Sequence, residues 1–88
     1  MITVNEKEIK TMQDKITYDV VRNIGVLAVN VAWETQVNLI SWNHRAPKFD
    51  IRKWNVETGS MSKGISLTES EARELAKVLT EYFEGEDE

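Results

Sequence analysis

A chain of 88 residues, with 41% hydrophobic and 30% charged residues, has the length for one small core and the balance of an ordinary globular domain. The absence of cysteine excludes a disulfide framework, a thiolate zinc site and a cysteine nucleophile. The net charge of −4 argues against general nucleic-acid binding, and no apolar run is long enough to cross a membrane. The N-terminus mixes acidic and basic residues, unlike a signal peptide, so we expect a cytoplasmic protein.

The charge is distributed unevenly along the chain. Residues 42–66 carry a net charge of +3, whereas residues 67–88 carry −6. Local patches, rather than the total, decide which partners a surface attracts. The acidic end is interpreted as one solvated face of a helix followed by a tail at residues 86–88. The basic middle of the chain therefore has to be considered separately.

Residues 1–16 are interpreted as an N-terminal extension or arm, and residues 17–85 as the single domain. A Thr and a Glu three residues apart allow a capping box, and apolar residues follow at helical spacing. A short helix fits this pattern, and a flexible arm fits it equally well. The residues concerned are Thr3, Glu6, Ile9, Met12 and Ile16.

Two stretches rich in β-branched residues follow, at residues 17–22 and 24–31. This composition disfavours an isolated helix and fits a pleated strand. Because Gly25 lies where the two stretches meet, the sequence allows either two strands or one strand that is bent or bulged near residues 23–25.

Further strands are predicted over residues 36–42, 48–56 and 64–67, separated by turns or loops at residues 32–35, 43–47 and 57–60. Pro47 supports the second of these breaks because it cannot donate to a strand ladder. Alternation along the strands places two sets of side chains on opposite faces of the sheet. One set is Asn38, Ile40, Trp42, Lys48, Asp50, Arg52 and Trp54, and the other is Val37, Leu39, Ser41, Phe49 and Ile51.

The C-terminal segment is predicted to be a helix. Thr68 is a suitable N-cap, Glu71 completes a capping box, and Gly85 is a natural C′ residue. An apolar stripe follows the helical period at Ala72, Leu75, Ala76, Leu79, Tyr82 and Phe83. Strands followed by one helix indicate the α+β class with an antiparallel sheet.

Part of this stripe is expected to form a dimer interface. One helix covers only one face of a sheet, so the open strand edges and the rest of the stripe favour pairing with a second copy. The interface residues expected are Leu75, Leu79, Tyr82 and Phe83.

The sequence lacks the side-chain sets that catalysis requires. His44 is the one histidine, so no second histidine or cysteine can complete a metal site. The glycines do not form a phosphate-binding loop, and the Asp50 and Glu57 carboxylates come with no pocket signature. We therefore expect no enzymatic activity, no metal and no cofactor.

Binding of a single-stranded nucleic acid has more support. Trp42 and Trp54 share a face with Lys48 and Arg52, and the loop between their strands contributes further polar side chains. Unpaired bases stack on aromatic side chains, and phosphates need lysine and arginine nearby. RNA satisfies these requirements as well as DNA does. The alternative is that the indoles are core or dimer contacts, and for Trp33 packing is favoured.

Three ordered stretches resemble the positive cofactor four family of transcriptional coactivators and single-stranded-DNA-binding proteins, and within it the small bacterial YdbC-like branch. They are Val37–Asn43, Pro47–Trp54 and Lys63–Thr68, followed directly by the predicted helix. The middle stretch contains Asp-Ile-Arg before an aromatic residue, and the third begins Lys-Gly-Ile-Ser-Leu. As an ordered set these motifs are fairly specific, and they cover about half the chain.

The resemblance implies a four-stranded, curved antiparallel sheet with a C-terminal helix, and a homodimer that binds single-stranded DNA with little sequence preference. It also implies roles for individual residues, with aromatic side chains stacking on bases and Lys and Arg taking the phosphates. Together with the loop residues, the expected nucleic-acid-binding set is Trp42, Asn43, His44, Arg45, Lys48, Arg52, Trp54 and Lys63.

The sequence therefore supports two functional hypotheses. The first is a dimeric, nucleoid-associated single-stranded-DNA-binding protein that serves transcription or DNA maintenance and meets transcription or replication proteins. The second is a protein–protein interaction module on the same fold that does not bind nucleic acid.

Overall fold

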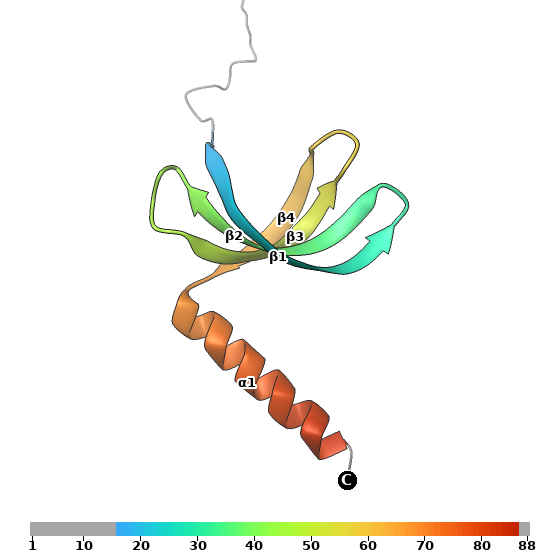
Figure 1. Ribbon diagram of the computed structural model, residues 1–88, viewed down its shortest axis with the longest axis vertical. Coiled ribbons are helices and arrows are strands. Elements are labelled where there is room, and N and C mark those ends of the chain that lie inside the picture. The colour runs from blue at the N-terminus through green and yellow to red at the C-terminus, as the bar shows by residue number, and fades with distance from the viewer. Residues whose placement is uncertain (1–15, 87–88) are drawn as a thin grey trace, which may run out of the picture.

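The computed structural model describes residues 16–86 and contains a four-stranded antiparallel sheet followed by one helix (Figure 1). The strands lie side by side in chain order. The elements are β1 (Tyr18–Asn30), β2 (Trp33–Trp42), β3 (Lys48–Asn55), β4 (Met61–Leu67) and α1 (Glu69–Glu86). The α+β fold class predicted from the sequence is thus confirmed. The short helix considered for residues 1–16, with its capping box, falls on residues 1–15 except for Ile16, and residues 1–15 lie outside the described residues.

β1 is one continuous strand, which confirms the bulged alternative. Its pairing with β2 shifts register three times, once near residues 23–25 and once on either side. Each shift leaves one residue of β1 without a partner, namely Val21, Ile24 and Leu27. Bulges increase the local twist of a strand and bend it. The long first strand can therefore follow a sheet that is strongly curved.

Several element boundaries differ from those predicted. β2 begins at Trp33, so the expected turn at residues 32–35 is shortened to a tight hairpin in which Val31 has a φ of 57°. β4 begins at Met61 rather than Gly64, because the Ser62–Lys63 region pairs with β3 through an irregular register despite its low strand propensity. The Lys53 N–H donates to the Ser62 hydroxyl there, at 3.2 Å.

The predicted capping box at the start of α1 is formed by both of its hydrogen bonds. The Glu71 N–H donates to Thr68 Oγ1 at 3.2 Å, and the Thr68 N–H donates to Glu71 Oε1 at 2.9 Å. The prediction for the other end was wrong, because Gly85 lies inside the last turn and α1 continues to Glu86. No positive φ is recorded for Gly85, so it does not form the left-handed cap expected of a C′ glycine.

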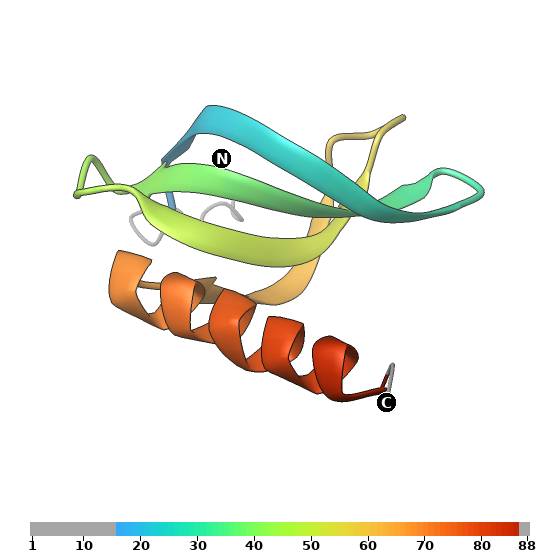
Figure 2. The same ribbon diagram turned by 60° about the horizontal axis from the view of Figure 1, so that its bottom comes forward.

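The helix extends away from the convex side of the sheet, as Figures 1 and 2 show from two directions. Among the described elements it contacts only β3 and β4. Ala72 is half-buried, but the larger apolar residues of the stripe stay between 36 and 61% exposed. These residues are Leu75, Leu79, Tyr82 and Phe83. One copy of the chain therefore leaves the apolar face of α1 largely uncovered.

The core lies on the concave face of the sheet. Tyr18 pairs with Trp42, whereas Trp54 pairs with Glu34, eight residues further along β2. A flat sheet would separate these pairs by roughly 26 Å, yet the Tyr18 and Trp54 rings are 5.7 Å apart. The sheet must therefore curl toward the face that carries them. The buried side chains, Ile40, Trp54, Asn38 and Asp50, all belong to this face by alternation.

No helix within residues 16–86 is long and apolar enough to cross a membrane.

Candidate nucleic-acid interface

A tight turn joins β2 to β3 and places the polar loop residues beside Trp42. Asn43 and His44 have φ values of 49° and 63°, and the Arg45 N–H donates to the Trp42 carbonyl at 2.9 Å. Two consecutive left-handed residues closed by this bond form a type I′ turn, a conformation that Asn tolerates well. The turn is anchored to the residue that precedes β1, because Asn43 Oδ1 accepts the Thr17 N–H at 3.0 Å.

A hollow of about 360 Å³ lies on the concave face next to this turn. Its lining comes from β2, β3, β4, the loop between β2 and β3, and the residue two positions before β1. The lining residues are Ile16, Trp42, Arg45, Ala46, Lys48, Arg52, Met61 and Ser66. Arg45 and Lys48 are exposed, and neither takes part in an ion pair within residues 16–86. An indole and two available cations thus surround one concavity. Such a site suits a flat ligand that carries negative charge.

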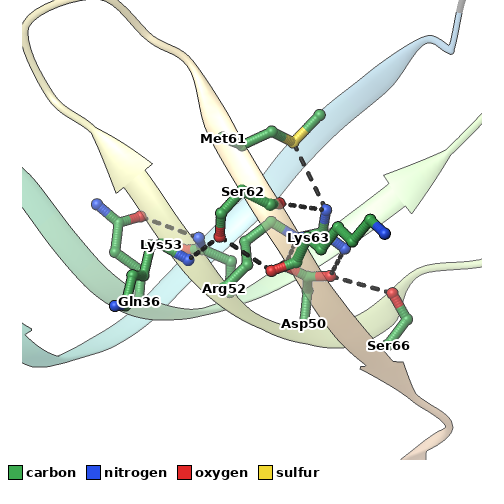
Figure 3. A network of polar contacts seen from close by, with 9 residues as sticks. Gln36, Asp50, Arg52, Lys53, Met61, Ser62, Lys63 and Ser66 are labelled. Atoms are coloured by element: carbon green, nitrogen blue, oxygen red, sulfur yellow. Dashed lines mark hydrogen bonds and ion pairs between the residues drawn. The ribbon is translucent and has the colours of Figure 1, made fainter.

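The third cation of the hollow, Arg52, is held in an ion pair. Arg52 donates from Nε to Asp50 Oδ2 and from Nη2 to Asp50 Oδ1, both at 2.7 Å (Figure 3). Asp50 is 0% exposed and also accepts a hydrogen bond from the Ser66 hydroxyl at 3.0 Å. The Arg52 guanidinium carbon lies 4.8 Å from the centroid of the Trp42 ring. A buried, bidentate ion pair therefore supports the indole.

The close approach of β3 to β4 explains why Gly64 stands in the Lys-Gly-Ile-Ser-Leu sequence. It stands opposite Arg52 in the pairing of β3 with β4. A Cβ at this position would collide with the Arg52 Cβ and the Ile51 carbonyl oxygen. Glycine at this position leaves the space in which the Arg52 side chain lies.

The two predicted indoles are linked by a tyrosine that the sequence analysis missed. The Tyr18 ring lies 5.6 Å from the Trp42 ring and 5.7 Å from the Trp54 ring, tilted against both. Trp54 is only 9% exposed, and the indole nitrogens of Trp42 and Trp54 have no hydrogen-bond partner among the described residues. Trp54 therefore forms the floor of an aromatic cluster. Tyr18 pairs with Trp42 across β1 and β2, and this pairing becomes visible only in the folded chain.

The predicted binding residues fall into three groups. Trp42, Arg45, Lys48 and Arg52 line the hollow, and Trp54 joins them through Tyr18. Asn43 and His44 form the adjoining turn. Lys63 is exposed in the irregular part of β4 and does not line the hollow. The rest of the lining is Ile16, Ala46, Met61 and Ser66, which were not among the predicted binding residues.

The opposite face carries a second hollow, of about 410 Å³. Its residues are Ala28, Asn30, Trp33, Thr35, Lys53 and Ser62. Trp33 and Lys53 thus lie away from Trp42 and Lys48, as strand alternation requires. These two residues provide matched controls for the concave site.

Comparison with known proteins agrees with this architecture. The chain is 38% identical to an uncharacterised protein of Treponema pallidum (strain Nichols) over 77 residues, which cover 86% of this chain and 91% of the relative. This relative does not identify a bacterial branch, so the YdbC-like branch stays a prediction. Residues 29–78 match the family described as Transcriptional Coactivator p15 (PC4). This match spans β2 to β4 and the first half of α1, including the whole lining of the hollow except Ile16. The chain therefore belongs to the Transcriptional Coactivator p15 (PC4) family.

Proposed function

We propose that this chain is a non-enzymatic single-stranded-DNA-binding protein with little sequence preference, acting as a homodimer in transcription regulation or DNA maintenance. The family is known for single-stranded DNA binding and coactivator roles. The observation that carries the proposal is the concave hollow, where Trp42 lies with Arg45 and Lys48. A base stacks on the indole, and the flanking phosphates meet the two cations.

Contacts to base faces and phosphates account for the low sequence preference. Every base has a π-face, so stacking tolerates any sequence, and phosphate contacts carry no sequence information. A duplex would have to be read by an element inserted into a groove. The helix of this chain is a poor candidate for that role, because Glu69 and Glu71 occupy its first turn.

The dimer is supported by the uncovered stripe of α1. Leu75, Leu79, Tyr82 and Phe83 are too exposed for a helix that has reached its final packing. A two-fold pair would bury the stripe and would place two concave faces in one assembly, doubling the surface for a strand of DNA. Sedimentation at micromolar protein tests this part separately from DNA binding.

Binding is tested by titrating the protein into a fluorescent oligo-dT over a range of salt concentrations, with a duplex of equal length beside it. We expect tight binding to the single strand, weaker binding to the duplex and a loss of affinity with salt. Lys48→Ala should weaken binding, whereas Lys53→Ala, on the same strand but the opposite face, should not. An absence of binding at low salt would refute the proposal and direct the function to a protein partner.

A further inference from the structure

We infer that Arg52 is a positioning residue for the Trp42 platform and does not bind phosphate. Asp50 neutralises its guanidinium and holds it over the indole, which leaves the phosphates to Arg45 and Lys48. This inference rests on the proposed function, since it concerns which residues of one binding site support base stacking and which bind phosphate. It departs from the role that the family resemblance suggests for the arginine of Asp-Ile-Arg.

Most of the N–H donors of Arg52 already have partners among the described residues. Two of them make the bidentate pair with Asp50, and Nη1 donates to the Ser62 carbonyl at 3.2 Å. Nη1 also lies 3.8 Å from the Met61 sulfur. The side chain is only 13% exposed. A phosphate that approached this guanidinium would find few open donors and would meet the negative charge of Asp50 as well.

The pair cannot open readily to serve a phosphate. Asp50 is 0% exposed, so the departure of Arg52 would leave a buried carboxylate without its counter-charge. Ser66 fixes the same carboxylate from β4, at 3.0 Å. The missing side chain of Gly64 provides the space through which Arg52 passes. Two residues of β4, Gly64 and Ser66, therefore accommodate or hold one conformation of the Arg52–Asp50 pair.

In this conformation Arg52 lies against the Trp42 indole, and both side chains line the hollow. The guanidinium carbon is 4.8 Å from the ring centroid, within the range of a cation–π contact. Such a contact limits the rotation of the indole and presents it in one orientation to a base. Arg45 and Lys48 differ from Arg52 in both respects, because they are exposed and have no ion pair within residues 16–86.

The salt dependence of oligo-dT binding separates the two roles. Each phosphate contact on a single strand contributes about 0.7 to the slope of log K against log salt. Replacing Arg52 alone would leave the buried Asp50 carboxylate without its counter-charge and would endanger the fold. The key variant is therefore the double replacement Asp50→Asn/Arg52→Gln, which removes both charges. We expect weaker binding at every salt concentration with an unchanged slope. Lys48→Gln is the matched control and should make the slope shallower by about 0.7.

Two further measurements make the result specific. Trp42→Ala by itself should weaken binding by about 5- to 150-fold. If Arg52 acts through Trp42, adding the double replacement to Trp42→Ala should cause no further loss of affinity. A merely structural role would give additive losses. Arg52→Lys should bind as weakly as the double replacement, because a lysine keeps the charge but cannot form the bidentate pair.

NMR of the unmodified protein gives a readout that needs no variant. The Arg52 Nε–H should be protected from exchange and should keep its resonance frequency when oligo-dT is added, because its partner stays Asp50. A shallower slope in the double replacement, rescue of binding by Arg52→Lys, or a large Nε–H shift on adding DNA would overturn the inference. Failure of the unmodified protein to bind oligo-dT would instead refute the proposed function.

Discussion

The replacement Gly64→Ala tests the packing of β4 against Arg52 directly. A Cβ at residue 64 would stand closer to the Arg52 Cβ and the Ile51 carbonyl oxygen than real Cβ atoms come. The carbonyl is part of the backbone and cannot rotate away, so either the two strands separate or the Arg52 side chain moves. The added methyl group also lies 2.9 Å from Arg52 Nε. The change therefore perturbs the strand pairing and the buried ion pair together.

The expected loss of stability follows from two opposing terms. Overpacking by one methyl group costs about 1–3 kcal/mol, and the reduced freedom of the unfolded chain returns about 0.4–1 kcal/mol. The net loss should be about 0–2.6 kcal/mol, with a central value of roughly 1.3 kcal/mol, if Arg52 keeps its contacts. If Arg52 is displaced from Asp50, the loss should rise to about 3–5 kcal/mol, the range for breaking a buried pair.

The matched control is Gly25→Ala on β1. A Cβ there would meet no described atom within 4 Å, and Gly25 has no left-handed φ. This replacement should be neutral or should stabilise the chain by up to about 1 kcal/mol. Urea unfolding followed by tryptophan fluorescence measures both variants, at one protein concentration because dimer stability depends on it. Equal midpoints for Gly64→Ala and Gly25→Ala would refute the packing argument.

Three other replacements probe separate parts of the fold. Thr68→Ala removes the N-cap of α1 and should cost about 1 kcal/mol in urea unfolding, whereas Thr80→Ala in mid-helix should cost far less. Leu79→Glu should convert a dimer into monomers in sedimentation velocity. Thr80→Glu, which adds the same charge outside the stripe, should leave the dimer intact. A Leu79→Glu variant that is still dimeric would place the interface elsewhere. Asn38→Ala leaves Asn23 and Gln36 without their amide partner and should destabilise the chain by about 1–3 kcal/mol, so a neutral result would show that water replaces it.

The local features of this fold were predictable because they depend on residues close in sequence. Thr68 and Glu71 contain both halves of the capping box, and each needs only the other to form it. Alternation along β3 put Asp50, Arg52 and Trp54 on one face, as the register confirms. These predictions rest on spacings of two or three residues, and each lies within a single helix or strand.

The remaining features depend on contacts between distant segments. Nothing near Tyr18 indicates that it meets both indoles, because that contact requires the sheet to curl across its full length. Asp50 and Arg52 share a face by alternation, but the complete burial of Asp50 comes from that curvature. The start of β4 at Met61 was missed for the same reason, since its strand conformation depends on pairing with β3. The placement of the site in a hollow could therefore not be read from the sequence.

The register shifts of β1 also bear on fibre growth. β1 is an outer strand of the described sheet, and its exposed apolar side chains would suit the addition of further strands. They are Val20, Val21, Ile24, Val26, Leu27 and Val29. An incoming strand would have to reproduce three interruptions in close succession, which a regular strand cannot do. Backbone irregularity thus disfavours the open-ended addition of strands at this edge.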